Sequence, residues 1–355
     1  CGPTNSGPSS TPEDKLRGVP DTSAPASFAL FDNNLDAPGQ AGAWLLTGLR
    51  ETITCTAQDD WRARLNALED AARAGAWVAL AASYELGYLI EPRLGKLLPN
   101  ASAPLFRAWI FERGDWLDCA ACEAWLEARA GDQPAGCSAL APRLGPDAYL
   151  EKIARIRQYI ADGDCYQVNF TFPLHGQTWG TAAALYRALR AAQPVRYGAF
   201  ITHADGAILS RSPELFLERR DRRLISKPMK GTAPRSSDPA VLARSAKDRA
   251  ENVMIVDLIR NDMGRLAPPG GVRVEDLCHV EAYPTVWQMT SRVIAEPVEA
   301  DLAEIFRALF PCGSITGAPK HHTMQLIAGL ESTPRGLYCG AIGWLDAPRD
   351  GQRCG

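Results

Sequence analysis

The stretch "SDPAVLARSAKDRAENVMIVDLIRNDMGR" (237–265) has the pattern of one long helix. We predict that Asp238 caps its start and that Gly264 follows its end as the C′ residue. Several strand-like runs stand before it, among them "YGAFI", "GAILSRS", "ELFLERR" and "RLISKPMKGT". Because these strands follow one another without strict β-α-β alternation, the pattern indicates an α+β fold rather than a doubly wound parallel sheet.

The same mixture continues upstream. The run "YLEKIARIRQYIADGD" (149–164) predicts a helix that ends at Gly163, and "CYQVNFTFPL" (165–174) alternates as a strand should. The helix would present one apolar face, formed by Leu150, Ile153, Ile156 and Ile160.

We expect three parts along the chain. Residues 1–25 are Gly/Pro/Ser-rich and predict disorder, and the Pro/Gly-containing stretch 131–148 is the boundary between an N-terminal region (26–135) and a larger domain (145–355). The N-terminal region predicts strands at 28–32 and 104–112, a buried strand and turn at 76–90, and a helix at 59–75. The last residues, "GWLDAPRDGQRCG", indicate a strand that enters a hairpin turn without returning, so we expect the chain to stop within a domain.

Composition points to small-molecule chemistry. The 355 residues are 46% hydrophobic and 22% charged, as in a globular protein. A net charge of −3 without a dense Lys/Arg run gives no reason to expect nucleic acid. No apolar run reaches the roughly 20 residues that a membrane span needs.

Ten cysteines are too dilute for a disulfide scaffold, which suits reduced thiols in the cytoplasm. Cys119 and Cys122 form a lone CxxC with no second ligand pair for zinc, so we interpret them as neighbours on a helix. Cys1, ahead of a Gly/Pro/Ser-rich segment, is compatible with a mature lipoprotein start and equally with a fragment boundary.

The loop "CGSITGAPKHHTM" (312–324) is one candidate site. Ser314 and Thr316 are hydroxyls in a Gly-rich turn, and Pro319 suits the first position of a following helix. Free backbone N–H groups at such a helix start would suit a carboxylate or phosphate. An ordinary capped helix start is the alternative, and the loop alone does not decide between them.

Three charged residues have two local interpretations each. Glu251 lies in a helix that is apolar almost all round, so its carboxylate is either a Mg²⁺ ligand or, as the local sequence favours, paired with Arg249 or another basic residue. Glu214 is either a general acid with a raised pKa or an edge-strand charge. Lys230 is either a desolvated nucleophile, aided by the nearby charges of Lys227 and Arg235, or a solvated lysine in a turn.

Several stretches together resemble the chorismate-utilising enzymes. In order over 149–346 they are "YLEKIARIRQYIADGDCYQVNFT", "SRSPELFL", "KPMKGTAPR", "DRAENVMIVDLIRNDMGR", "TGAPK" and "PRGLYCGAIGW". "SYELGY" (83–88) looks like part of a compact version of the family's N-terminal region. The resemblance implies two packed, mainly antiparallel sheets flanked by helices.

Two positions indicate a branch within that family. Lys230 stands before Gly-Thr where anthranilate synthases usually carry Ala, and Gln167 stands where water-adding isochorismate synthases place a lysine base. Both favour the branch that forms 4-amino-4-deoxychorismate, toward p-aminobenzoate and folate. Anthranilate synthase or another chorismate-utilising enzyme is the alternative, and a small-molecule-binding lipoprotein is the alternative outside enzymes.

The resemblance also implies roles. Lys230 would attack carbon 2 of chorismate while Glu214, as general acid, assists departure of the carbon-4 hydroxyl; ammonia from a separate glutamine amidotransferase subunit would then add at carbon 4. Glu251 would ligate Mg²⁺. Positions around the substrate match Gly231, Thr232, Ser314, Thr316, Gly317 and Tyr338.

Two departures from the family pattern stand out. Gln288 occupies a position where many relatives have His, and Gln does not shuttle protons near neutral pH. The family also continues beyond this chain with a strand, a Gly-rich turn and a helix that supplies further Mg²⁺ carboxylates. We therefore expect this chain to be inactive without that segment.

Overall fold

The structure is a computed structural model that describes residues 27–36, 41–99, 103–346 and 353–354. Within these residues one 13-stranded sheet forms the body of the molecule, and its strand pairs are antiparallel. Twelve of its strands are hydrogen-bonded in the order β11 (Gly206–Ser212), β10 (Tyr197–His203), β1 (Ala29–Asn33), β2 (Gly42–Cys55), β4 (Phe106–Asp118), β3 (Trp77–Ala82), β18 (Ala341–Leu345), β19 (Arg353–Cys354), β12 (Leu215–Arg220), β13 (Arg223–Lys227), β16 (Val286–Ala295) and β14 (Met229–Pro234). The remaining strand, β15 (Val272–Ala282), also pairs with β16.

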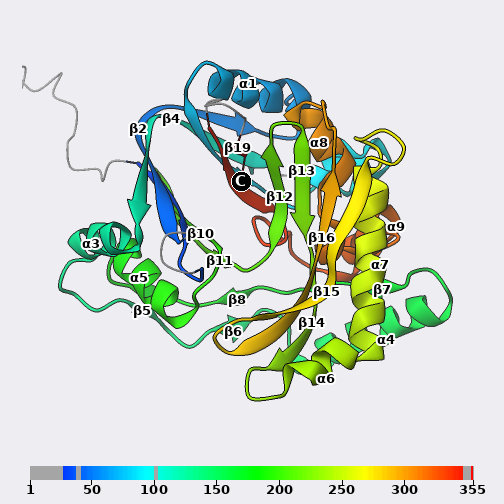
Figure 1. Ribbon diagram of the computed structural model, residues 1–355. Coiled ribbons are helices and arrows are strands. Elements are labelled where there is room, and N and C mark those ends of the chain that lie inside the picture. The colour runs from blue at the N-terminus through cyan, green and yellow to red at the C-terminus, as the bar shows by residue number, and fades with distance from the viewer. Residues whose placement is uncertain (1–26, 37–40, 100–102, 347–352, 355) are drawn as a thin grey trace, which may run out of the picture.

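The sheet bends into two halves, one around β2 and β4 and one around β12 to β16 (Figure 1). In the described residues β19 joins them, because it pairs with both β18 and β12. This arrangement agrees with the predicted mainly antiparallel α+β architecture, with the two sheets continuous at their junction.

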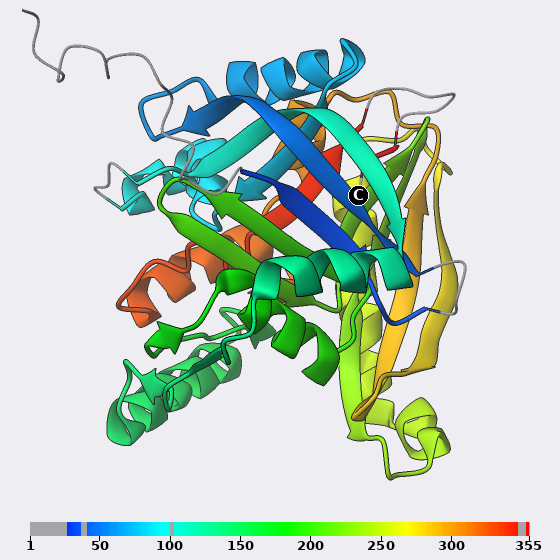
Figure 2. The ribbon, with the colours of Figure 1, turned by 90° about the vertical axis from the view of Figure 1, so that its left-hand side faces the viewer.

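Helices bury the outer faces of both halves (Figures 1 and 2). On β3 and β4, α1 (Trp61–Arg73) and α8 (Leu302–Leu309) pack through residues such as Leu65 and Phe306. On β13 and β16, α7 (Ala246–Met263) packs through Ile255 and Ile259. A third cluster joins α3 (Cys119–Ala130) and α5 (Ala182–Ala192) to β1, β2 and β10.

Shorter elements connect this framework. The helical ones are α2 (Leu86–Ile90), η2 (Pro92–Leu97), α4 (Pro146–Ala161), α6 (Pro239–Arg244), η3 (Gly313–Ile315) and α9 (Lys320–Leu330). The two-stranded pairs are β7 (Gln167–Val168) with β17 (Gly317–Ala318), β5 (Gly136–Cys137) with β9 (Thr178–Trp179), and β6 (Ala141–Pro142) with β8 (Leu174–His175).

Strands from both sides of the predicted boundary at 131–148 share the sheet. β10 lies beside β1, and β18 lies beside β3. The division into 26–135 and 145–355 stays a prediction, and residues 1–25 lie outside the described residues.

The single helix predicted over 237–265 is wrong. The chain forms α6, capped by Asp238 as predicted, and then α7, with an extended Ser245 between them (φ −62°, ψ 110°). The Ser245 hydroxyl oxygen accepts a hydrogen bond from Asp248 N, so it starts the second helix. Gly264 ends α7 with φ −62°, a helical value instead of the left-handed one expected of a C′ glycine.

Two further predictions need correction near α4. This helix stops before Gly163 (φ +83°) as predicted, but of its apolar face only Ile156 is buried, and Leu150 is 63% exposed. The strand predicted over 165–174 is reduced to β7 and the start of β8, because residues there bond to the 316–318 backbone instead of a long neighbour.

The prediction that the last strand does not return was also wrong: β18 is followed by β19, which pairs back onto it at Leu345. Cys119 and Cys122 lie on α3 as predicted, and the eight cysteines whose side chains are described are free. Among the described residues, no helix has the length and apolarity to cross a bilayer.

Candidate active site

Glu214 lies in the turn between β11 and β12. Its side chain is contacted by a residue 100 positions later in the chain. Ser314 Oγ, on η3, donates a hydrogen bond of 2.6 Å to Glu214 Oε1. Burial raises the pKa of Glu214, although the Ser314 hydrogen bond and the Lys230 charge each pull it down. A carboxyl with a raised pKa beside an amine and a hydroxyl is suited to proton transfer.

Lys230 is half-buried on β14, at an irregularity in the strand. The β14–β16 register shifts between Met229 and Thr232, and Gly231 adopts φ +98°. A Cβ at Gly231 would lie 3.0 Å from Asp248 Cβ, so a glycine lets the strand pass close to α7. The bulge re-aims β14 where the lysine stands.

Asn252 on α7 supports this bulge. Its Nδ2 donates to the carbonyl oxygens of Lys230 and Met289, both at 3.3 Å, and its Oδ1 accepts from Ser291 Oγ at 2.5 Å. The sequence analysis missed Asn252, because a buried amide in a helix carries no local signal for what it binds. The one available hint was that Asn252 directly follows Glu251, a candidate Mg²⁺ ligand.

The positive charges expected to act on Lys230 have partners of their own. Lys227 forms an ion pair with Glu281, and the Arg235 guanidinium lies 3.7 Å from the Trp287 ring centroid. Glu214 does interact electrostatically with Lys230.

The 312–319 loop is packed tightly around Ser314 and Thr316, which are 1% and 0% exposed. Thr316 Oγ1 donates to the carbonyls of Cys312 and Gly313 at 3.0 and 3.2 Å, so this hydroxyl braces the loop. A Cβ at Gly317 (φ +139°) would lie 2.1 Å from the Gln167 carbonyl oxygen, which only glycine permits.

The loop ends at the start of α9. Pro319 is the N-cap residue, one position earlier than predicted, and provides no side-chain cap. Lys320 is buried: its Nζ lies 2.5 Å from Asp262 Oδ2 and donates to Leu309 O at 3.0 Å. This lysine is therefore held by its own carboxylate and fixes the loop to α7 and α8.

Gln167 lies directly against the loop, since it pairs with Ala318. Its side-chain oxygen is buried and has no hydrogen-bond partner among the described residues. Such an orphaned acceptor is costly unless a ligand or water occupies the space beside it. The observation fits a donor, such as an amine or ammonia, next to the loop.

Thr232 and Gln288 face each other on β14 and β16. Thr232 Oγ1 donates to Gln288 Oε1 at 3.0 Å. Gln288, which departs from the family pattern, thus directly contacts Thr232, one of the residues predicted to bind the substrate. Gln288 holds Thr232 without offering a titratable group.

Tyr338, the last predicted substrate residue, is 69% exposed and follows a loop that is firmly anchored. Arg335 donates to Glu331 at 2.7 Å and to Ile315 O at 3.0 Å, linking this loop to η3. Glu85, in the predicted "SYELGY" motif, accepts from Arg335 N at 2.7 Å. Sequence reasoning missed these anchors because their partners lie up to 250 positions apart.

Glu251 stands apart from this group in its contacts. It is half-exposed and pairs with Lys247, 3.8 Å away, which is the basic-residue alternative left open by the sequence. The predicted all-round burial of α7 is wrong, since Val253 is 38% exposed. No group of three His, Cys, Asp or Glu side chains in the described residues could hold a metal ion. Glu251 therefore fits Mg²⁺ only as one oxygen ligand among waters and substrate oxygens.

The family model described as chorismate binding enzyme matches residues 35–354 of this chain. The chain belongs to the chorismate binding enzyme family. Among curated family relatives, aminodeoxychorismate synthase component 1 of Klebsiella aerogenes is 45% identical over 237 residues, 62% of this chain and 52% of that protein. Anthranilate synthase component 1 of Streptomyces coelicolor is 39% identical over 208 residues, 56% of this chain and 41% of that protein.

The chain spans about half the length of the curated relatives it matches. The crystal structure of anthranilate synthase component I from Streptococcus pneumoniae has the same fold, with a TM-score of 0.70 at 21% identity over 96% of this chain and 85% of that chain. The α+β chorismate-binding-enzyme fold predicted from the sequence is thereby confirmed.

Proposed function

We propose that the full-length protein is an aminodeoxychorismate synthase component I, which converts chorismate and ammonia to 4-amino-4-deoxychorismate. The observation that carries this proposal is the meeting of Lys230, Glu214 and Ser314 from three distant segments. An amine nucleophile and a carboxyl with a raised pKa form the pair that a two-step displacement requires. The names of several curated relatives support the same branch.

The first step forms the bond between Lys230 Nζ and carbon 2 of chorismate. Both ring double bonds shift, the carbon-4 C–O bond breaks, and Glu214 gives its proton to the departing hydroxyl, which leaves as water. In the second step ammonia attacks carbon 4, both double bonds shift back and the bond to Nζ breaks. Glu214 now takes a proton from the incoming nitrogen, which restores its protonated form.

The other residues would bind and orient the substrate. Ser314 positions the Glu214 carboxyl, and Thr316 braces the loop that carries Ser314. The residues that would surround the substrate ring are Gly231, Thr232, Gly317 and Tyr338. Gln167 offers its free side-chain oxygen to the incoming ammonia. A Mg²⁺ ion, when bound through Glu251, would neutralise a substrate carboxylate.

The ammonia source and the location of the protein are further parts of the proposal. A separate glutamine amidotransferase subunit would supply ammonia, and the free cysteines of the described residues suit the reducing cytoplasm. Anthranilate synthase activity is the competing function, because anthranilate synthase component 1 is also among the relatives.

Product analysis decides between them. The full-length protein is incubated with chorismate, Mg²⁺ and an ammonium salt, and the products are separated by chromatography. We expect aminodeoxychorismate, and anthranilate or no product would overturn the proposal. Without ammonia, digestion and mass spectrometry should find a chorismate-minus-water adduct on the peptide that contains Lys230.

Two lysine variants test the nucleophile. Lys230→Ala should lose most of the activity and the adduct, whereas Lys96→Ala, which removes an exposed lysine on η2, should keep both. Full activity of Lys230→Ala with the same product would show that another group performs the substitution.

A further inference from the structure

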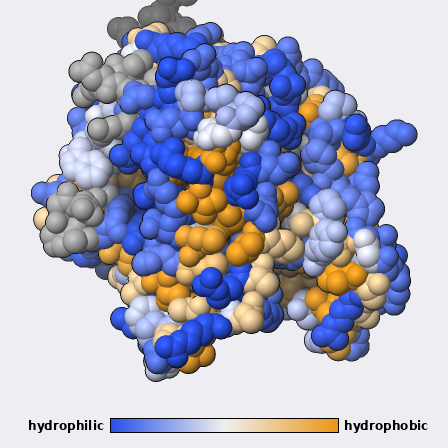
Figure 3. Space-filling view, turned by 45° about the vertical axis from the view of Figure 1, so that its right-hand side comes forward, coloured by the Kyte–Doolittle hydropathy of each residue, from blue (hydrophilic) through white to orange (hydrophobic). Residues whose placement is uncertain are grey.

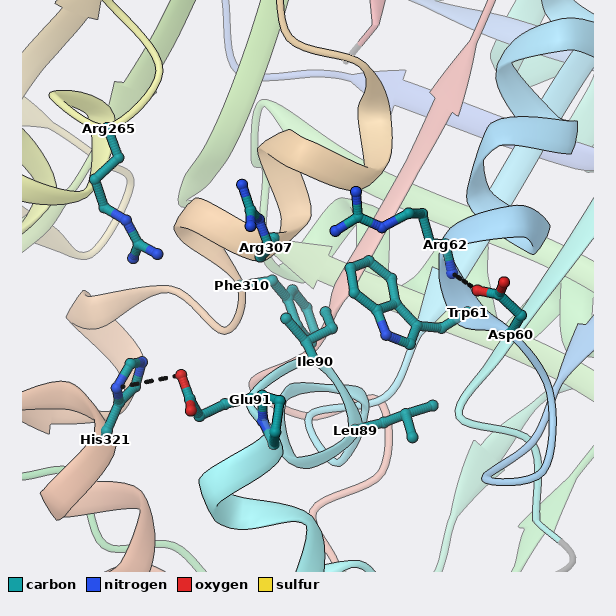
Figure 4. A pocket seen from close by; sticks show the side chains of 11 residues that line it. Asp60, Trp61, Arg62, Leu89, Ile90, Glu91, Arg265, Arg307, Phe310 and His321 are labelled. Atoms are coloured by element: carbon teal, nitrogen blue, oxygen red, sulfur yellow. Dashed lines mark hydrogen bonds and ion pairs between the residues drawn. The ribbon is translucent and has the colours of Figure 1, made fainter.

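A cavity lies apart from the Lys230 site, and none of the site residues described above lines it. Its volume is about 500 Å³. It forms where the start of α1, the junction of α2 and η2, the end of α8 and the start of α9 meet (Figure 4). We call it the arginine cavity, after Arg62, Arg265 and Arg307 in its wall.

These three arginines come from separate segments. Arg62 is on the first turn of α1, Arg265 follows α7, and Arg307 is on α8. All three are exposed, and no ion pair or side-chain hydrogen bond joins any of them to another described residue. Figure 4 shows the guanidinium groups of Arg62 and Arg307 on the same side of the cavity, with Arg265 beyond them.

The two carboxylates in the wall already have partners of their own. Asp60 caps α1 and accepts from the backbone N–H groups of Arg62 and Ala63 at 3.0 and 3.1 Å. Glu91 lies 3.6 Å from His321 and accepts from Arg93 N at 3.3 Å. The wall therefore carries more positive than negative side chains, and its arginines lack anionic partners.

The remaining wall is apolar. Ile90 and Phe310 are buried, and Trp61 is half-buried with the Arg62 guanidinium 5.5 Å from its ring centroid. In Figure 4 the Trp61 ring and the Ile90 side chain lie between the arginines and Leu89. A ligand here would contact a hydrophobic surface and charged donors together. Figure 3 shows hydrophobic patches among mostly hydrophilic residues on one face of the molecule.

We propose that the arginine cavity binds a small organic anion that carries at least two acidic groups, carboxylate or phosphate, on an apolar or aromatic body. Guanidinium groups bind both kinds of acid through paired hydrogen bonds, which a point charge does not reproduce. Pockets for small molecules are commonly about 300–1,000 Å³, so the cavity suits a metabolite better than a protein segment. This site is independent of the chemistry proposed for Lys230.

Calorimetric titration of the full-length protein tests the proposal. The probes are phthalate, an aromatic dicarboxylate, and phenyl phosphate, an aromatic phosphate, in buffered 0.15 M NaCl to screen weak surface attraction. We expect at least one of them to bind with a Kd below about 1 mM. Arg62→Ala and Arg307→Ala should each weaken that binding about tenfold to a hundredfold, as expected for lost hydrogen bonds to a charged group.

Two controls separate this site from other binding. Arg260→Ala removes an exposed arginine on α7 that pairs with Asp257 outside the cavity, and its affinity should equal that of the wild type. Lys230→Ala should also bind the probe with the affinity of the wild type. A loss of affinity in this variant would show that the probe binds at the proposed catalytic site instead.

The outcomes are distinct. Binding of phthalate that depends on the arginines supports the proposal with a carboxylate ligand, and the same result for phenyl phosphate supports it with a phosphate ligand. It is overturned if neither probe binds, if Arg260→Ala weakens binding as much as Arg307→Ala, or if inorganic phosphate binds as tightly as phenyl phosphate. Binding of a hexaglutamate peptide in place of both probes would also overturn it, in favour of a protein-docking surface.

Discussion

Glu214 shows how burial, a hydrogen bond and a nearby charge together shift the pKa of one carboxyl. Burial raises its pKa, because the charged carboxylate loses its hydration, while Ser314 and Lys230 stabilise the charged form. The balance leaves the pKa above its ordinary value. If Glu214 must start each cycle protonated, activity falls as the pH rises through that pKa.

Ser314→Ala therefore has a predictable direction. Loss of the hydroxyl donor removes stabilisation of the carboxylate, so the pKa of Glu214 rises further. In a pH profile of kcat/KM, the descending limb that reports Glu214 should move to higher pH. A limb that moves to lower pH would contradict the proton-donor role, and Glu214→Gln should lack this limb.

Asn252→Ala tests the support of Lys230. It would leave the buried carbonyls of Lys230 and Met289 without their donor, which costs about 1–3 kcal/mol of unfolding free energy for each unsatisfied group. Urea denaturation should show this loss, and kcat should fall more than KM rises because the lysine is misplaced. Asn261→Ala, at an exposed position of the same helix, is the control and should change neither.

At the scale of elements, the break between α6 and α7 gives Ser245 a measurable role. Its hydroxyl caps α7, so Ser245→Ala should lower the unfolding free energy by about 1 kcal/mol, and Ser245→Thr should restore much of it. Equilibrium urea unfolding of both variants provides the measurement. Equal stability of the alanine variant and the wild type would mean that the cap contributes nothing.

Elements with strong local patterns were predictable. The helix at 59–75 appears as α1, and the strands at 28–32 and 104–112 appear as β1 and the longer β4. The break at Ser245 was missed because the apolar pattern continues across it, and a serine cap is a weak local signal. The alternation over 165–174 suggested a strand, but that segment bonds to the 316–318 backbone, which no local pattern predicts.

The candidate site was predictable only through the resemblance. Lys230 and Glu214 each look like ordinary surface charges in their local sequence, and their proximity depends on the path of the sheet and on Ser314. The partners of Arg335 and Asn252 lie on other elements, so their roles came from the structure alone.

At the scale of the whole molecule, a buried ionic cluster joins the N-terminal strand to later segments. Asp32 on β1 accepts from Arg190 Nε on α5 and Arg211 Nη1 on β11, both at 2.8 Å, and also from Tyr186. The Asp32 side chain is 0% exposed. The cluster therefore ties residues more than 150 positions apart.

Asp32→Asn should be strongly destabilising, because it removes the counter-charge of the buried Arg211 guanidinium and one of the two carboxylates that pair with Arg190. We expect a loss of about 3–5 kcal/mol in unfolding free energy. Asp205→Asn is the matched control: it removes the 67%-exposed partner of Arg107, and should cost at most about 1 kcal/mol. Similar losses in the two variants, measured by urea unfolding, would contradict the proposed importance of burial.

The sharing of one sheet by early and late strands has a consequence for how the chain can be divided. A cut between α3 and α4 would separate β1 from β10 and β3 from β18, exposing long unpaired edges on both pieces. Neither piece could then bury its core alone, yet each would present the strand partners that the other lacks. The protein is thus suited to fragment complementation, in which two co-expressed pieces rebuild the fold by restoring their missing strand neighbours.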